Sequence, residues 1–91
     1  MSTQEIIYIG EKPASGYIVE ILTLLKKGRE KIILKARGPN ISKAAGIAES
    51  VKKMTGNKIK YGEIKLYSEE VGEEAEEKMI PVLEIEIISL L

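Results

Sequence analysis

The sequence contains no cysteine, no histidine and no aspartate. Without cysteine the chain forms no disulfide and offers no thiolate to a metal ion. Without histidine it lacks the commonest general base and metal ligand of proteins. The serines therefore have no base partner for a nucleophilic triad, and no glycine-rich nucleotide-binding motif is present. We expect a protein that is not an enzyme, with no catalytic residues, metal site, cofactor or small-molecule substrate.

Long apolar runs are also missing. No stretch approaches the roughly 20 apolar residues of a membrane span, so we expect no membrane partner. The N-terminus lacks the basic and then apolar segments of a signal peptide, which favours a cytoplasmic protein. The 91 residues suffice for one modest hydrophobic core, so residues 1–91 are expected to form a single domain. Many Glu, Lys and Ile residues, with no Cys, Trp or Phe, favour a heat-adapted source.

Positive and negative charges cancel over the whole chain but are unevenly distributed along it. Residues 1–60 carry 12 Lys or Arg against 5 Glu, a net charge of +7. Residues 61–91 carry 2 Lys against 9 Glu, a net charge of −7. Each half makes its own local field, so the pattern predicts a basic body that attracts phosphate groups and an acidic appendage. The glutamates of residues 69–77 lack the spacing of a cation-binding loop and indicate a solvated tip.

Hydrophobic periodicity divides the chain into strands and helices. Short β-branched and aliphatic runs predict strands over residues 6–9, 31–37, 57–71 and 79–90. Apolar spacings of three and four predict helices from Pro13 to about Lys27 and from Ile41 to Met54. The inward stripe of the second helix is expected to be Ile41, Ala44, Ala45, Ala48 and Val51. This order predicts an α+β fold, a two-layer β-α-β-α-β-β sandwich with both helices on one face of a four-stranded mixed sheet.

The last two predicted strands form a hairpin that is longer than the helices. A strand of about 12 residues spans roughly 40 Å, whereas a helix of about 14 residues spans roughly 21 Å. The outer part of the hairpin, near Tyr67 to Lys78, should therefore project as an arm that embraces a ligand or lies against a partner subunit. The apolar alternation changes face around Gly62, which predicts a bulge, and Pro81 is typical of an edge strand.

The segment from Lys35 to Lys43 joins the end of a buried strand to the start of a helix. Gly38 and Pro39 end the strand, and Asn40 suits the N-cap of the helix. Unpaired N–H groups and the positive end of the dipole make a helix start attractive to phosphate. Another helix start follows Lys12, and a right-handed crossover between parallel strands would bring both starts to one edge. The candidates for a shared phosphate-binding surface are Lys12, Lys35, Arg37, Asn40 and Lys43. The alternative is an ordinary solvated turn.

Three stretches of the sequence form a recognisable combination. They are Ile9-Gly10-Glu11-Lys12-Pro13 with Tyr17-Ile18, Leu22-Thr23-Leu24-Leu25 with Gly28, and Ile33-Leu34-Lys35-Ala36-Arg37-Gly38 with Ile41-Ser42-Lys43-Ala44. Together with the element order, they resemble the Alba family of small archaeal chromatin and RNA-binding proteins. The resemblance covers nearly the whole chain, from Ile7 to Ile88.

The resemblance implies a dimer that coats double-stranded DNA with little sequence preference, often binds RNA, and associates with the chromosome. It assigns nucleic-acid contacts to Lys12, Arg37 and Lys43 and, less directly, to Asn40 and Tyr17. It places the dimer surface on the third strand. The candidates for the dimer surface are Met54, Ile64 and Leu66, each of which would equally suit the intramolecular core.

Three features depart from the family pattern. Glu11 replaces the first of two basic residues before Pro13, which argues against the acetylation control associated with that pair. Pro39 replaces a second Arg after Arg37-Gly38. The arm carries many glutamates, which a DNA minor groove repels.

These departures leave several partners open. We expect DNA binding weaker than is typical of the family, or an arm used to contact the basic body of a neighbouring dimer. The chain would be a homodimer or a heterodimer with a more basic paralogue, or would prefer structured RNA. The alternative function is an assembly subunit, such as a ribonucleoprotein component, in which the acidic hairpin makes protein contacts.

Overall fold

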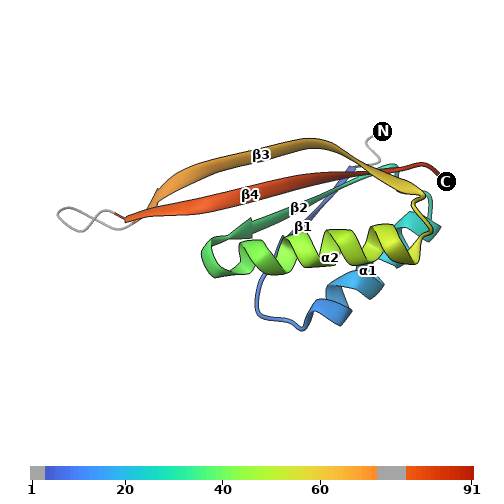
Figure 1. The fold of residues 1–91 in the computed structure, drawn as a ribbon, viewed down its shortest axis with the longest axis horizontal. Coiled ribbons are helices and arrows are strands. Elements are labelled where there is room, and N and C mark those ends of the chain that lie inside the picture. Colours follow the sequence, from blue (N-terminus) through green and yellow to red (C-terminus); the bar gives the residue numbers. More distant parts are fainter. Residues whose placement is uncertain (1–3, 72–77) are drawn as a thin grey trace.

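The computed structural model describes residues 4–71 and 78–91. The elements are β1 (Gln4–Ile9), α1 (Ala14–Lys26), β2 (Lys31–Arg37), the 3₁₀ turn η1 (Gly38–Asn40), α2 (Ile41–Met54), β3 (Ile59–Val71) and β4 (Lys78–Ser89). The sheet order is β1-β2-β4-β3, and Figure 1 shows both helices on one face of this sheet. The predicted α+β fold is therefore confirmed, including the bounds of β2 and α2.

Strand direction decides where the helices begin. β1 and β2 pair in parallel, whereas β4 is antiparallel to both β2 and β3. The chain crosses from β1 to β2 through α1, and the carboxyl ends of these two strands meet at one edge of the sheet, with Ile9 opposite Ala36. Both helices start at this edge and run back across the sheet (Figure 1).

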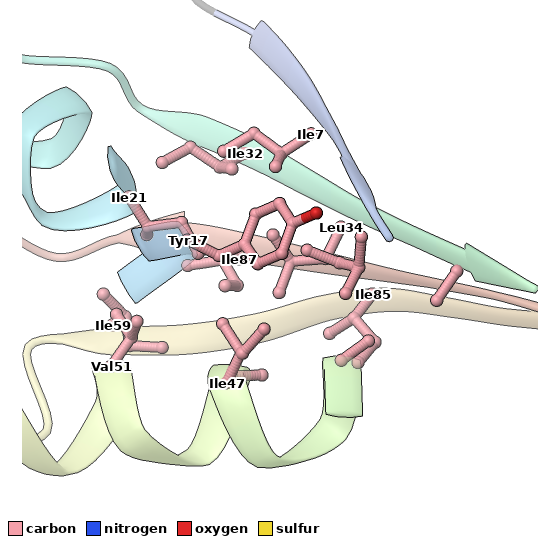
Figure 2. Close-up of a cluster of buried hydrophobic side chains, with 14 of the residues drawn as sticks. Ile7, Tyr17, Ile21, Ile32, Leu34, Ile47, Val51, Ile59, Ile85 and Ile87 are labelled. Carbon is pink, nitrogen blue, oxygen red and sulfur yellow. The ribbon is translucent and has the colours of Figure 1, made fainter. Parts of the chain in front are cut away.

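The core lies between the sheet and the two helices. Burial alternates along β2, where Ile32 and Leu34 are buried on the helix side. The labelled side chains in Figure 2 come from both helices and all four strands and converge in this layer. The predicted inward stripe of α2 was wrong at one position, because Ala45 is exposed and Ile47 is buried instead. Ile47 lies three residues after Ala44, so it continues the buried stripe along the helix axis.

The predicted bulge in β3 is present, as the pairing with β4 shifts between Tyr61 and Ile64. A Cβ atom on Gly62 would stand 2.0 Å from the Glu86 carboxylate oxygen. That oxygen accepts a hydrogen bond of 3.0 Å from the backbone N–H of Glu63. This bond, helped by the Lys31 ammonium, lowers the pKa of Glu86. Gly62 therefore leaves room for the carboxylate that satisfies the bulged backbone.

Two predictions about prolines need correction. β4 lies between β2 and β3 and is not an edge strand. Its pairing with β2 ends at Val82, so Pro81 belongs to a part of β4 that pairs only with β3. The N–H that proline lacks is therefore not needed for hydrogen bonding to a second neighbouring strand. Pro13 was expected at the first helical position, but it precedes α1 as the N-cap residue, with an extended ψ of 148°.

The predicted arm begins where β2 ends. Beyond the pair Arg37 and Val82, residues 68–71 of β3 and residues 78–81 of β4 continue as a two-stranded ribbon. Figure 1 shows this ribbon extending past the helices. The acidic tip expected at residues 72–77 lies outside the described residues.

Candidate nucleic-acid interface

Two turns meet at the carboxyl ends of β1 and β2, and we call this region the turn edge. It comprises the turn of residues 10–13, the turn η1 and the side chains of Lys12 and Lys43, and Arg37 adjoins it at the end of β2. Gly38 has a φ of +51°, a conformation that favours glycine, and it redirects the chain from β2 into Pro39. The sequence prediction that both helix starts share one edge is therefore confirmed by the parallel pairing.

Lys43 joins the two turns directly. Its ammonium donates a hydrogen bond of 2.6 Å to the carbonyl oxygen of Gly10 and another to the carbonyl oxygen of Lys12. An ammonium has three donors, so one N–H of Lys43 stays available to a ligand. The two helix starts are thus fixed relative to each other by a cation that lies between them.

Tyr17 holds Gly10, Lys12 and Lys43 in position. Its side chain is only 4% exposed, and its hydroxyl accepts a hydrogen bond of 2.7 Å from the N–H of Gly10. The ammonium groups of Lys12 and Lys43 lie 4.7 Å and 5.5 Å from the centre of its ring. Such contacts attract cations to an aromatic face. The geometry makes Tyr17 a positioning residue for two lysines, and its buried ring offers no surface for stacking.

Lys35 does not join Lys12 and Lys43, and this prediction needs correction. Side chains of a strand alternate between faces, and Leu34 and Ala36 point into the core, so Lys35 points to the open face of the sheet. There its ammonium lies 3.8 Å from the Glu84 carboxylate. A hydrogen bond with Tyr67 raises the pKa of Lys35, and Glu84 adds to the effect.

Arg37 and Asn40 line the border between the turn edge and the open face. The Arg37 guanidinium forms an ion pair of 3.0 Å with Glu69, which belongs to the arm. Asn40 occupies the predicted N-cap position, but its side chain makes no capping bond because the backbone arrives already helical, with a ψ of −3°. Both residues line a shallow hollow of ≈ 240 Å³ together with Tyr8, Ile9, Lys35 and Ala36.

Carboxylates already accompany most cations of this region. Lys12 pairs with Glu20 at 3.5 Å, in addition to the pairs of Lys35 and Arg37.

The opposite end of the body carries six further lysines, which we call the far lysines: Lys26, Lys27, Lys52, Lys53, Lys58 and Lys60. Within residues 4–71 and 78–91, none of the far lysines has a carboxylate within 4.0 Å. Sequence reasoning counted them in the basic body but did not place them.

An apolar surface lies beside α2. A groove of ≈ 230 Å³ is lined by Ala45, Ala48, Glu49, Tyr61, Ile64, Leu83 and Ile85. Ile64 is 54% exposed and Leu66, further along β3, is 72% exposed, so neither is core. Met54 is also exposed, but it ends α2 and does not line the groove. Burial and a hydrogen bond to Glu49 raise the pKa of Tyr61.

Other site types receive little support from the described part of the chain. Among those residues, no group of three or more acidic side chains is placed to hold a metal ion. Neither helix described is long and apolar enough to cross a membrane.

Comparison with known proteins gives a consistent answer. The sequence model of the Alba family matches residues 5–68. The DNA/RNA-binding protein Alba of Nanoarchaeum equitans is 33% identical over 85 residues, covering 90% of this chain and 94% of that protein. The protein of the same name from Thermoplasma acidophilum is 36% identical, covering 93% and 96%. The relatives come from archaea, thermophiles among them, which agrees with the heat-adapted composition.

Solved structures support the same fold. Alba from Thermoplasma volcanium superposes with a TM-score of 0.84 at 35% identity, covering 91% of this chain and 98% of that one. ALBA1 from Trypanosoma brucei superposes with a TM-score of 0.77 at 16% identity, covering 92% of this chain and 68% of that one. At 16% identity, the second superposition is evidence for the fold alone.

Proposed function

The chain belongs to the Alba family, and on that basis we propose that residues 1–91 form one nucleic-acid-binding domain without catalytic activity. It holds double-stranded DNA and RNA by their phosphate backbones, with little dependence on base sequence. The observation that carries this proposal is the meeting of two helix N-termini with Lys12 and Lys43 at the turn edge, which Arg37 adjoins at the end of β2. Its place in the cell would be the cytoplasm, on the chromosome.

The turn edge suits phosphate for two physical reasons. Helix N-termini present unpaired N–H groups and a positive dipole end, and cations beside them add attraction without reading bases. The existing ion pairs oppose binding only weakly, because exposed pairs such as Lys12–Glu20 contribute about 0–1 kcal/mol. Hydrogen bonds to a charged phosphate contribute about 1.5–3 kcal/mol, so a phosphate group would displace such a carboxylate.

We propose that the functional unit is a dimer formed through the apolar groove beside α2. Exposed apolar side chains next to a groove mark a protein contact surface. Ile64, which lines the groove, and Leu66, further along β3, provide that surface in the described chain, whereas Met54 at the end of α2 does not line the groove. A two-fold dimer would double the number of turn edges available to one nucleic-acid molecule. A second copy and a more basic paralogue are both compatible with this surface.

One observation supports a second candidate function. The arm glutamate Glu69 pairs with Arg37 and thereby occupies a proposed phosphate ligand. Such an arm would suit a subunit that prefers RNA, or an assembly subunit whose hairpin contacts protein. Titration with structured RNA and with duplex DNA at physiological salt separates these cases. An assembly subunit would bind neither.

The salt dependence of binding tests the turn edge. Arg37→Ala and Lys12→Ala should each weaken binding to a short duplex DNA and lower the log–log salt slope by about 0.9 per lost contact. Lys53→Ala is the matched control, since it removes one exposed positive charge from the opposite end of the body. Equal losses for Lys53→Ala and Arg37→Ala would mean that overall charge, or the far lysines, holds the duplex instead.

A further inference from the structure

The open face of the sheet carries an exposed aromatic side chain, that of Tyr8. Tyr8 belongs to β1, an edge strand, and is 65% exposed on the face opposite the helices. Within residues 4–71 and 78–91 its hydroxyl makes no hydrogen bond, and its only ring contact is the Lys35 ammonium at 5.9 Å. Tyr67 differs, since its hydroxyl is bonded to Glu84 and its pKa is raised by that bond. Tyr8 thus presents a free aromatic surface to solvent.

The charges around Tyr8 are balanced rather than basic. On the open face Lys31 lies 3.4 Å from Glu86, Lys35 lies 3.8 Å from Glu84, and Arg37 lies 3.0 Å from Glu69. Each of these pairs is neutral overall, so the open face attracts the many phosphates of a duplex little, although a single phosphate at its border can replace Glu69 on Arg37. An uncharged, flat nucleobase is therefore a better ligand for this face than a row of phosphate groups.

The hollow beside Tyr8 has the parts of a nucleotide site. Its ≈ 240 Å³ are lined by Tyr8, Ile9, Lys35, Ala36, Arg37 and Asn40. The amide of Asn40 both donates and accepts hydrogen bonds and makes no capping bond, so it matches the edge of a nucleobase. Arg37 borders both this hollow and the turn edge, so a strand whose phosphates lie along the turn edge could place a base here.

We propose that Tyr8 is a stacking platform for an unpaired nucleobase of single-stranded RNA or DNA, with Asn40 at the base edge and Arg37 at the adjoining phosphate. Stacking on exposed aromatic rings is the usual way that proteins hold single strands. A duplex hides the faces of its bases, so the platform adds affinity only for single strands. The proposal deepens the nucleic-acid function proposed above and rests on it for the phosphate contact.

The test compares two substitutions at Tyr8. Tyr8→Val removes the ring but keeps a residue that favours strands, and Tyr8→Phe keeps the ring without the hydroxyl. The probes are a single-stranded oligouridylate of about eight nucleotides and a duplex DNA of mixed sequence, each followed by fluorescence anisotropy. Tyr8→Val should weaken oligouridylate binding roughly 5- to 150-fold, whereas Tyr8→Phe should stay within about twofold of the wild type. Neither should change duplex affinity, and circular dichroism checks that both variants fold.

Tyr8→Trp gives a direct readout, because the chain has no tryptophan of its own. A base stacked on this ring should quench its fluorescence, and the duplex should not. The platform is overturned if Tyr8→Val binds oligouridylate as tightly as the wild type, or loses duplex and oligouridylate affinity equally. If the wild type binds duplex but not oligouridylate, the stacking proposal for Tyr8 is refuted, whereas phosphate binding at the turn edge is supported. If it binds oligouridylate through Tyr8 but does not bind duplex, the stacking proposal is supported and the proposed duplex binding is refuted.

Discussion

Neutralising Glu69 tests whether the arm competes with nucleic acid for Arg37. The Glu69 carboxylate lies 3.0 Å from the guanidinium, and the two side chains are 30% and 57% exposed. An ion pair this exposed contributes about 0–1 kcal/mol. A phosphate that binds Arg37 must break this pair, so Glu69→Gln should raise duplex affinity by up to about fivefold. Folding stability should fall by less than about 1 kcal/mol.

Anisotropy titration of a labelled duplex at low and moderate salt measures the effect. Glu70→Gln is the matched control, because it makes the same charge change one residue along β3, and neighbouring side chains point to opposite faces. Glu70 is exposed and has no cation within 4.0 Å in the described chain. Its substitution should raise affinity only through the smaller, general loss of negative charge.

A double variant completes the test. If Glu69 acts by occupying Arg37, then Glu69→Gln should add little affinity to an Arg37→Ala protein. Equal gains from Glu69→Gln and Glu70→Gln, or an undiminished gain in the Arg37→Ala background, would refute the competition and leave only a long-range effect of arm charge.

Three further predictions follow from particular contacts. Gly62→Ala should destabilise the fold by about 0.5–1.5 kcal/mol in thermal denaturation, because its Cβ would displace the carboxylate that accepts the exposed N–H of the bulge. Gly46→Ala, where a Cβ meets nothing within 4 Å, should stabilise the fold by up to about 1 kcal/mol. Leu66→Lys should convert the proposed dimer to a monomer in light scattering while the circular-dichroism spectrum stays that of the folded protein, and an unchanged mass would argue against the exposed β3 surface beside the groove as the interface. The folded-state pKa of Glu86 is lowered from 4.5, so its contribution is present above pH 4.5 and is lost as the pH falls through the folded pKa. The stability difference between the wild type and Glu86→Gln should therefore shrink on acidification, and a difference that is constant with pH would contradict the assignment.

The sequence determined the order and type of the elements, because local periodicity carries that information. The bounds of α2, Ile41–Met54, follow from apolar spacing and from the proline before it. The bulge at Gly62 was visible as a change of face. The meeting of both helix starts at one edge follows from the handedness of crossovers between parallel strands.

The composition of the site was less accessible. Lys12 and Lys43 were grouped correctly, because each flanks a helix start and both starts share an edge. Lys35 was grouped with them through its nearness in sequence, although the alternation of β2 turns it to the other face. Tyr8 gave no signal beyond that of an ordinary strand residue, because exposure on an uncovered face depends on which side the helices take.

Only the tertiary structure decided the strand order and the partners of the charges. A hairpin can add to a sheet through either of its strands, and the sequence predicted an edge position for β4, which the structure places beside β2. That choice aligns Glu84 and Glu86 with the lysines of β2, and the continuing arm carries Glu69 to Arg37. The pairing of charges therefore depends on contacts between residues far apart in the chain, which periodicity along a single segment does not encode.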